Sequence, residues 1–420
     1  MNRLDEGGAT GVGARGADWA PPQYALQLRR QIYPDTVPAF AAAELERLYS
    51  NVYSTLLRFR LFEDMTGVST YVERGDGQLT TILLFHRHGP LVRVLNQQIA
   101  LEPAAILAFA ETVFDSFKGV NKIAFWAIQA TLGVARADAA TRDASTPDAS
   151  TPDVSTPDAS TPDVSTRDAS TPDAFPYPFQ QCYCIDEISI ALPPSPQAYL
   201  ARLGKSTRHN IRYYLNRLKQ QAPGYAFTVY TTDQIAEQQI HAIIALSRAR
   251  LASKHKRSDV DAVATARMLA LCGAYGLIGV LSIDGAIAAG VIAYQVGRRY
   301  FVQVVGHDAR YDTLRVGTLS YYLTIVACIE RGGLECRLMG STHEYKYNLN
   351  GVRMPLDALV LYRTRVYFLL DSVGRARSAC RAVLGQGRQW LLLAERRGDR
   401  LSRWAAAGLR QLRAWKKKWH

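Results

Sequence analysis

The stretch LIGVLSIDGAIAAGVIAYQVGRRYFVQVVGH, residues 277–307, decides the fold class. It contains three β-rich runs separated by two tight turns, Asp284-Gly285 and Gly297-Arg298. The runs cover residues 277–283, 286–296 and 300–307. Two-residue turns that contain glycine, between such runs, are the strongest short-range signal of a β-hairpin. The sequence therefore predicts three consecutive antiparallel strands.

Helical periodicity follows these strands. Apolar residues recur at helical spacing from Leu319 to Ile329, and Gly332-Gly333 ends the pattern. A short apolar run at 334–339 and a final β-rich run at 356–362 come next. Strands, helix, strand, short helix and strand are typical of an α+β fold. We expect a mixed, mostly antiparallel sheet flanked by helices.

The joint between the third strand and the helix carries candidate binding residues. Backbone N–H groups are unpaired at a helix start and the helix dipole is positive there, so phosphate can bind. Gly317 would let a ligand approach the backbone, and Thr318 would supply a hydroxyl. We predict a phosphate-binding site at Arg315, Gly317 and Thr318.

Five motifs in this order resemble the GNAT acyltransferases. They are LGKSTRHNIR (203–212), IDGAIAA (283–289), HDARY (307–311), RVG (315–317) and GSTHEYK (340–346). More narrowly, the chain resembles the BioF2-like or cellulose-biosynthesis acetyltransferase branch, which is related to the Fem aminoacyl-transferases. The resemblance covers roughly residues 180–363 and implies a GNAT-like domain at 175–365.

The resemblance also implies an activity. It implies an N-acyltransferase that uses acetyl-CoA or another acyl-CoA as co-substrate and needs no metal. The acceptor would be an amino sugar or a nucleotide-linked, amino-bearing precursor of envelope or extracellular polysaccharide. Two alternatives stay open: a Fem-like transferase that uses aminoacyl-tRNA, and a non-catalytic scaffold at the membrane.

Acyl transfer to an amine needs a base, a donor to the oxyanion and an acid for the leaving thiolate. His307 and Asp308 end a strand beside the helix start and are candidate bases, and Glu344 next to His343 is another. Asp308 has an alternative role as a turn cap. The candidate acids are Tyr311, Tyr345 and Tyr347. Lys346 is a candidate ligand for a phosphate or carboxylate of the acceptor.

A basic stripe lies upstream, at Lys205, Arg208 and Arg212. Their spacing places them on a different helix side from Ile211 and Leu218. We expect them to bind phosphates of a substrate; the alternative is a solvated helix face.

The preceding residues form a first lobe at about 21–140, after a disordered N-terminus at 1–20. Its expected elements are a helical segment at 38–62, strands at 79–85 and 91–95, a helix at 104–117 and a strand at 122–128. This order of hairpin, helix and strand is the same as the order expected at residues 286–339. Two interpretations stay open: a degenerate second GNAT lobe or an unrelated α/β cap.

The two lobes are separated by a repetitive segment at 141–174. Asp recurs every five residues from 143 to 173 within D-A/V-S-T-P units. This period fits neither helix nor strand, and such units bury no apolar surface. We expect a disordered insertion.

Charge is concentrated at the C-terminus. Of the net +13, about +10 lies in the last fifty residues, with thirteen Lys/Arg against three Asp/Glu. Residues 366–420 are expected to form basic amphipathic helices, in which a stripe from Leu401 to Trp419 faces an anionic membrane surface. One alternative is that this segment packs on the body of the protein as a C-terminal helix. The least favoured alternative is that it binds nucleic acid. Six cysteines without a C-x-x-C pair indicate a reduced, cytoplasmic protein, peripheral at the inner face of the membrane.

Overall fold

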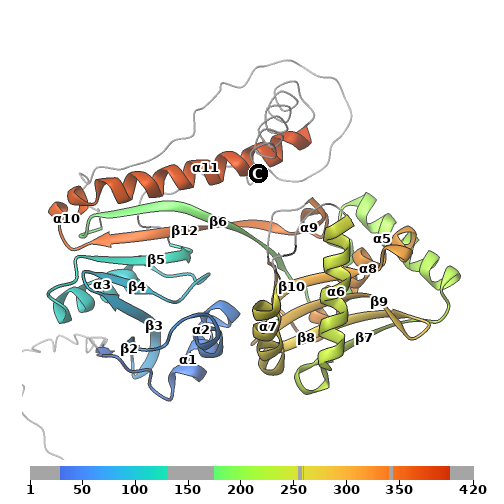
Figure 1. The fold of residues 1–420 in the computed structure, drawn as a ribbon, viewed down its shortest axis with the longest axis horizontal. Helices are drawn as coiled ribbons and strands as arrows, with labels where there is room; N and C mark the ends of the chain where they lie inside the picture. Colours follow the sequence, from blue (N-terminus) through green and yellow to red (C-terminus); the bar gives the residue numbers. More distant parts are fainter. Residues whose placement is uncertain are drawn as a thin grey trace, which may run out of the picture.

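The structure is a computed structural model that describes residues 29–130, 132, 175–253, 258, 260–339 and 344–397. The described strands form one 12-stranded sheet in the order β1-β2-β3-β4-β5-β12-β6-β11-β10-β9-β8-β7 (Figure 1). Helices flank the sheet, and most neighbouring strands are antiparallel. The α+β class with a mostly antiparallel sheet is confirmed.

The first half of the sheet comes mainly from residues before 130. Its elements are β1 (Arg29–Tyr33), α1 (Ala41–Tyr49), η1 (Val52–Ser54), α2 (Leu56–Phe62), β2 (Val68–Gly75), β3 (Gln78–His88), β4 (Leu91–Val94), α3 (Pro103–Ser116) and β5 (Lys122–Ile128). We call this part the first lobe.

The second half of the sheet begins with a long strand. Its elements are β6 (Phe179–Ala191), α4 (Pro196–Arg202), α5 (Lys205–Gln221), β7 (Tyr225–Thr231), η2 (Thr232–Gln234), α6 (Glu237–Ser253), α7 (Ala262–Tyr275), β8 (Gly276–Ile283), β9 (Ala286–Val296), β10 (Arg299–His307), η3 (Ala309–Leu314), α8 (Val316–Glu330), β11 (Glu335–Leu338), α9 (Glu344–Asn348) and β12 (Val352–Tyr362). The chain then continues in α10 (Arg365–Leu370) and α11 (Ser372–Arg397). We call the part from α4 to α9 the second lobe.

The two lobes repeat one topology. In the first, β1, β2, β3 and β4 pair antiparallel in turn, and β4 pairs parallel with β5. In the second, β7, β8, β9 and β10 pair antiparallel, and β10 pairs parallel with β11. The helices also correspond, because α1 and α2 occupy the place of α6 and α7, and α3 that of α8.

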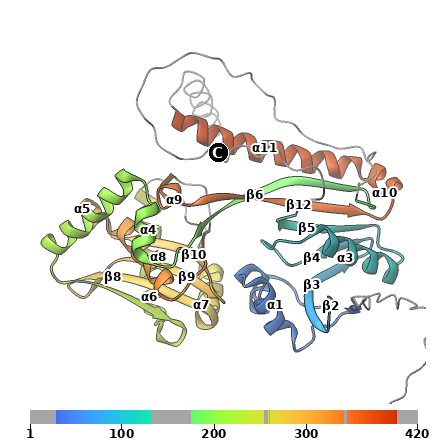
Figure 2. The same ribbon diagram turned by 180° about the vertical axis from the view of Figure 1, so that it is seen from behind.

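The lobes exchange their last strands. The strand that follows β5 in sequence is β6, and it pairs with β11 of the second lobe. The strand that follows β11 is β12, and it pairs with β5 of the first lobe. Strands β6 and β12 also pair with each other from Ser189 and Val352 to Phe179 and Leu361. Both strands run along one side of the molecule and join the lobes (Figures 1 and 2).

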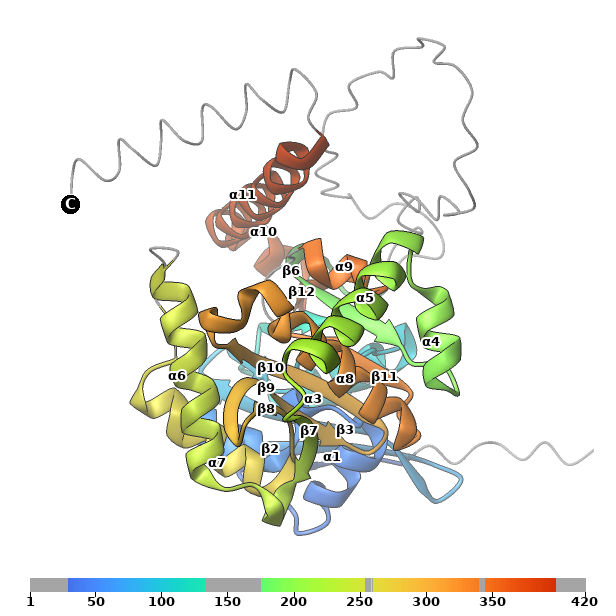
Figure 3. The same ribbon diagram turned by 90° about the vertical axis from the view of Figure 1, so that its right-hand side faces the viewer.

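Side chains that alternate along the strands of the second lobe pack into two apolar layers, one on each face of the sheet. Leu277 and Val291 belong to the apolar cluster that includes α8, whereas Ile278 and Ile292 belong to the cluster that includes α6 and α7. Side chains of successive strand residues point to opposite sheet faces. Figure 3 shows α6 and α7 on one side of these strands and α8 with α5 on the other.

Several local predictions can be compared with these elements. Both hairpin turns are confirmed, with Asp284, Gly285 and Gly297 at positive φ. The single helical segment at 38–62 is wrong, because Ser50 adopts a left-handed conformation (φ 43°) that ends α1, and η1 and α2 follow. Strands β1 and β2 were not expected.

Other predictions fall outside the described residues. They are the disordered N-terminus (1–20), the repeat segment (141–174) and the stripe from Leu401 to Trp419. Within the part that the structure describes, none of the helices is long and apolar enough to cross a membrane.

Candidate active site

The joint between β10 and α8 is a short turn that leads directly into the start of a helix. Arg315 adopts a left-handed conformation (φ 54°) and precedes the first residue of α8, Val316. The N–H groups of Thr318 and Leu319 both donate to the Arg315 carbonyl oxygen at 3.0 Å. Arg315 and Thr318 are exposed, and Gly317 is half-buried. The predicted phosphate-binding residues therefore lie together on the surface at the positive end of a helix dipole.

The sheet opens beside this helix start. Strand β10 pairs with β11 only from Arg299 to Val302, where β11 reaches its end at Leu338. A bulge follows between Val302 and Val304, and β10 continues to His307. The last residues of β10 thus extend past their parallel partner, toward the start of α8.

Gly317 is required by a neighbouring side chain. A Cβ atom at Gly317 would lie 2.6 Å from Nδ1 and 2.9 Å from Cγ of His307, so no larger residue fits without movement. The Nε2 atom of His307 lies 2.9 Å from Oδ1 of Asp312, in η3. His307 therefore packs across the start of α8 and holds it against η3.

Asp308 has the contacts of a turn cap. One carboxylate oxygen accepts from the Arg310 backbone N–H at 2.9 Å, and the other accepts from its guanidinium at 2.7 and 2.9 Å. These bonds hold the pKa of Asp308 below its usual range. A carboxylate paired in this way is a weak proton acceptor, so its contacts favour the capping role over the predicted role as base.

Lys346 is in the interior and not at the surface. Its side chain is 2% exposed, and Nζ donates to the carbonyl oxygens of Leu338 and Met339 at 2.9 Å each. Burial lowers its pKa to about 8, although the neighbouring Glu187 opposes this shift. Its amine binds backbone oxygens at the end of β11, and its predicted role as a ligand for a phosphate or carboxylate of the acceptor stays a prediction.

Glu187 forms a buried polar cluster with residues of both lobes. Arg337 Nη1 donates to its carboxylate at 3.3 Å and to the Gln98 carbonyl oxygen at 3.1 Å. In the orientation that satisfies its hydrogen bonds, the Gln98 amide also donates to both Glu187 oxygens, at 2.9 and 3.1 Å. Burial raises the pKa of Glu187 to about 7, against the opposing charge of Arg337.

Sequence reasoning missed this cluster. Glu187, Arg337 and Gln98 come from β6, from β11 and from the segment after β4. A charged residue in an alternating strand usually faces solvent, so the sequence alone gave no reason to bury Glu187.

The candidate tyrosines lie at two different places. Tyr311 is half-buried in η3, below the guanidinium of Arg310. Tyr345 is in α9, 41% exposed, with its ring 5.7 Å from that of the buried Tyr321 of α8. Burial raises the pKa of Tyr345, so its phenol stays protonated near neutral pH and can donate a proton. Tyr347 also lies in α9.

Glu344 is the first residue of α9, but its side chain is outside the described part of the structure, as is all of His343. Its predicted role as a base therefore stays a prediction.

The basic stripe lies on α5, which packs against both η3 and α8. Lys205 and Arg212 are exposed, and Arg208 is half-buried, with Nη1 bonded to the Ala201 carbonyl oxygen at 3.2 Å. The sequence of α5 has five Lys/Arg and no Asp/Glu. The three predicted substrate-binding residues thus belong to a positively charged helix next to the predicted phosphate site.

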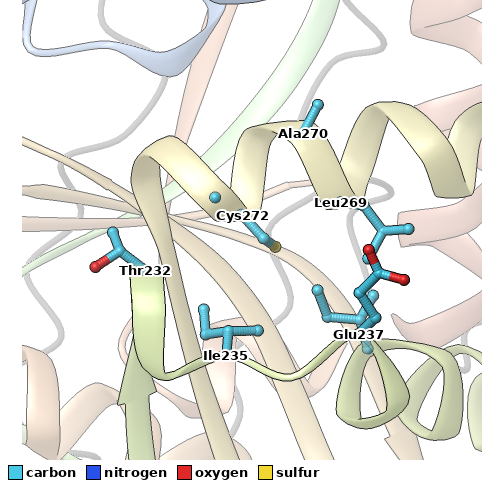
Figure 4. A pocket seen from close by; sticks show the side chains of 8 residues that line it. Thr232, Ile235, Glu237, Leu269, Ala270 and Cys272 are labelled. Atoms are coloured by element: carbon cyan, nitrogen blue, oxygen red, sulfur yellow. The ribbon is translucent and has the colours of Figure 1, made fainter.

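A pocket of about 300 Å³ lies elsewhere in the second lobe, between the start of α6 and α7 (Figure 4). It is lined by residues that include Thr232, Glu237, Leu269 and Cys272. This is the sheet face opposite α8, and the pocket contains none of the predicted site residues. Among the described residues, no group of three or more His, Cys, Asp or Glu is placed to hold a metal ion.

Comparison with known proteins assigns the class of the second lobe. Residues 205–347 match the family described as an acetyltransferase (GNAT) domain. This range includes α5, the joint between β10 and α8, and Lys346. The second lobe therefore contains a GNAT acetyltransferase domain, and the chain is an enzyme of the acyltransferase class.

One solved structure extends the likeness in fold over both lobes, and two others are reported beside it. The crystal structure of FemX covers 81% of this chain and 99% of its own, with 8% identity and a TM-score of 0.53. L-PGS from Bacillus licheniformis covers 83% of this chain and 98% of its own, with 14% identity and a TM-score of 0.41. The match to the C-terminal domain of a lysylphosphatidylglycerol synthetase from Agrobacterium fabrum covers 80% of this chain and 94% of that domain's chain, with 11% identity and a TM-score of 0.42. No curated protein matches the chain in sequence.

Proposed function

We propose that the chain is an N-acyltransferase that takes its acyl group from acyl-CoA. The observation that carries this proposal is the position of the α8 start, where β10 extends past its parallel partner. The pyrophosphate of the donor would bind the first N–H groups of α8 and the Arg315 guanidinium. Its acyl thioester would lie along the end of β10, where pairing with β11 has stopped.

In the reaction, the neutral amine of the acceptor attacks the thioester carbonyl carbon. The C–N bond forms, and the tetrahedral intermediate then breaks its C–S bond and releases the thiolate of CoA. The amine loses one proton and the thiolate gains one, so the charge balances. The protein must therefore supply an acceptor and a donor of protons.

Glu187 and Lys346 suit the acceptor role. Their pKa values of about 7 and about 8 lie near neutral pH, where a base acts most efficiently. Both lie at the end of β11, next to the point at which β10 and β11 part. Tyr345 suits the donor role, because its phenol is partly exposed on α9 and carries a proton at neutral pH. In this proposal, His307 and Asp308 shape the helix start and transfer no proton.

The acceptor class follows from the resemblance to envelope and polysaccharide enzymes. We propose an amino-bearing sugar or nucleotide-linked precursor, and phosphates on such a molecule would meet Lys205, Arg208 and Arg212 of α5. The enzyme would then act in the cytoplasm, where acyl-CoA is made.

A second candidate donor is aminoacyl-tRNA, and α5 gives a specific reason to keep it. Its five Lys/Arg are accompanied by Tyr213, which is 50% exposed and stacks on His209. Cations beside exposed aromatic rings bind the phosphates and bases of single-stranded nucleic acid. The same helix can therefore serve the phosphorylated acceptor of an acyl-CoA reaction or a tRNA donor.

A donor screen by thermal unfolding separates these candidates. Stabilisation by acetyl-CoA or a longer acyl-CoA, together with transfer of its acyl group to an amine, supports the proposal. Stabilisation by a charged tRNA and not by any acyl-CoA would replace it with the second candidate. Uncharged tRNA and free CoA serve as controls for binding that does not depend on the acyl group.

A further inference from the structure

An exposed apolar surface lies on α10 and the first half of α11. Its side chains are 62–74% exposed, although each is a large aliphatic residue. They are Val366, Leu369, Leu370, Val373 and Leu384. We call this set the α10–α11 ridge.

The ridge faces away from the sheet. On α11, Val373, Arg377, Cys380 and Leu384 follow one another at i, i+4, i+7 and i+11, which is one line along a helix. All four are exposed. The opposite line contacts β6.

Two contacts identify that opposite line. Gln180 of β6 donates to the Arg375 carbonyl oxygen at 3.0 Å. A Cβ atom at Gly385 would lie 3.4 Å from the Tyr183 ring. Figures 1 and 2 show α11 running along the outer side of β6 and β12, at the edge of the molecule. The exposed line of α11 therefore lies away from β6.

The ridge is surrounded by positive charge. Arg365, Arg377 and Arg381 are exposed. The single acid between residues 363 and 387 is Asp371, whose Oδ2 accepts from Lys122 Nζ and Tyr362 Oη at 2.9 Å each. Because that carboxylate is already paired, the described part of this surface presents no free negative charge.

We propose that the α10–α11 ridge binds the surface of an anionic lipid membrane, with the helices parallel to the membrane plane. The aliphatic side chains enter the boundary between head groups and acyl chains, and the three arginines contact lipid phosphates. The lack of an unpaired acid in the described part of this surface favours an anionic lipid over a protein of mixed charge. This contact holds the enzyme at the membrane surface.

Vesicle sedimentation of the full chain tests the proposal. The vesicles are phosphatidylcholine alone, or phosphatidylcholine mixed with phosphatidylglycerol. We expect binding to the mixed vesicles and much weaker binding to the neutral ones. The double variant Leu370→Glu/Val373→Glu should bind at least about tenfold more weakly, because it removes apolar contacts and adds two like charges.

Matched variants make the result specific. Val263→Glu replaces an apolar residue of α7 that is 57% exposed, and it should bind as the wild type does. Arg377→Glu should weaken binding about fivefold or more, and added salt should reduce that difference. All variants should keep the wild-type melting temperature within a few degrees, since these side chains contact solvent.

Three results would overturn the assignment. They are unchanged binding of the double variant, equal binding to neutral and anionic vesicles, and self-association of the wild type through the ridge without any vesicle binding. Light scattering after size-exclusion chromatography measures the last of these.

Discussion

Lys346 of α9 donates a hydrogen bond of 2.9 Å to the backbone carbonyl oxygen of Leu338, the last residue of β11. A second bond of the same length goes to Met339. Strand β11 stops pairing with β10 at Leu338, so the buried amine fixes the backbone where the two strands part. Lys346 thus connects the fold of the second lobe to its proposed chemistry.

Replacing Lys346 with methionine should reduce acyl transfer by about 10²-fold or more, as the loss of a proton-transfer group does. Two buried carbonyl oxygens would lose their donor, so the free energy of unfolding should fall by about 1–3 kcal/mol. Steady-state transfer rates and urea unfolding measure the two effects. The matched control is Lys118→Met, at a lysine whose side chain is 78% exposed in the first lobe. Full activity of the Lys346 variant would remove this residue from the mechanism.

Glu187 should make stability depend on pH. Its folded pKa of about 7 lies above the ordinary carboxyl pKa of 4.5, so the folded state binds the proton more tightly than the unfolded state. The stabilising contribution is therefore complete below pH 4.5 and is lost as pH rises through 7. Its size should be on the order of 3 kcal/mol. Urea unfolding at a series of pH values should show this fall in the wild type and a flatter profile in Glu187→Gln.

Lys346 has the opposite effect at higher pH. Its folded pKa of about 8 lies below the ordinary lysine pKa of 10.5, so the unfolded state binds more protons between these values. The free energy of unfolding should therefore rise with pH over this interval. The rise should be absent in Lys346→Met, and its persistence there would assign it to another group.

Gly317 and His307 should be coupled energetically. Gly317→Ala places a methyl group against the imidazole and should destabilise the protein by about 1–3 kcal/mol. Removing the imidazole with His307→Ala should relieve most of that cost in the double variant. A double-mutant cycle from urea unfolding measures the coupling. Additive effects would show that the contact at Gly317 is not what excludes a side chain.

Asp308→Asn should lower turnover by no more than about fivefold, since this carboxylate is bonded to Arg310 and caps η3. The melting temperature should fall slightly because the cap is weakened. A loss of about 10²–10⁴-fold in kcat with unchanged donor affinity would instead identify Asp308 as the general base.

The parts of the fold that sequence reasoning found depend on local chemistry. Asp284-Gly285 and Gly297-Arg298 specify their turns within a few residues, and the apolar spacing of α8 is visible along one segment. The exchange of β6 and β12 was not visible, because each strand pairs with partners that are distant in sequence.

The candidate site divides in the same way. Arg315, Gly317 and Thr318 were found from a local strand-to-helix signal, yet the packing of His307 that demands Gly317 was not. The Glu187 cluster is formed by residues from three segments of the chain and both lobes, so no single sequence motif predicts it. Lys346 was selected as a site residue, but its burial depends on where β11 ends relative to α9.

The most direct test of the account is calorimetric titration of acetyl-CoA into the wild type and into Arg315→Glu. Arg315 is exposed at the start of α8, so the new carboxylate should repel the donor pyrophosphate without disturbing the core. We expect about tenfold or weaker binding by this variant, and wild-type binding by Arg331→Glu, which changes an exposed arginine at the other end of α8. Equal donor affinity in the wild type and Arg315→Glu would place the donor elsewhere and contradict the account.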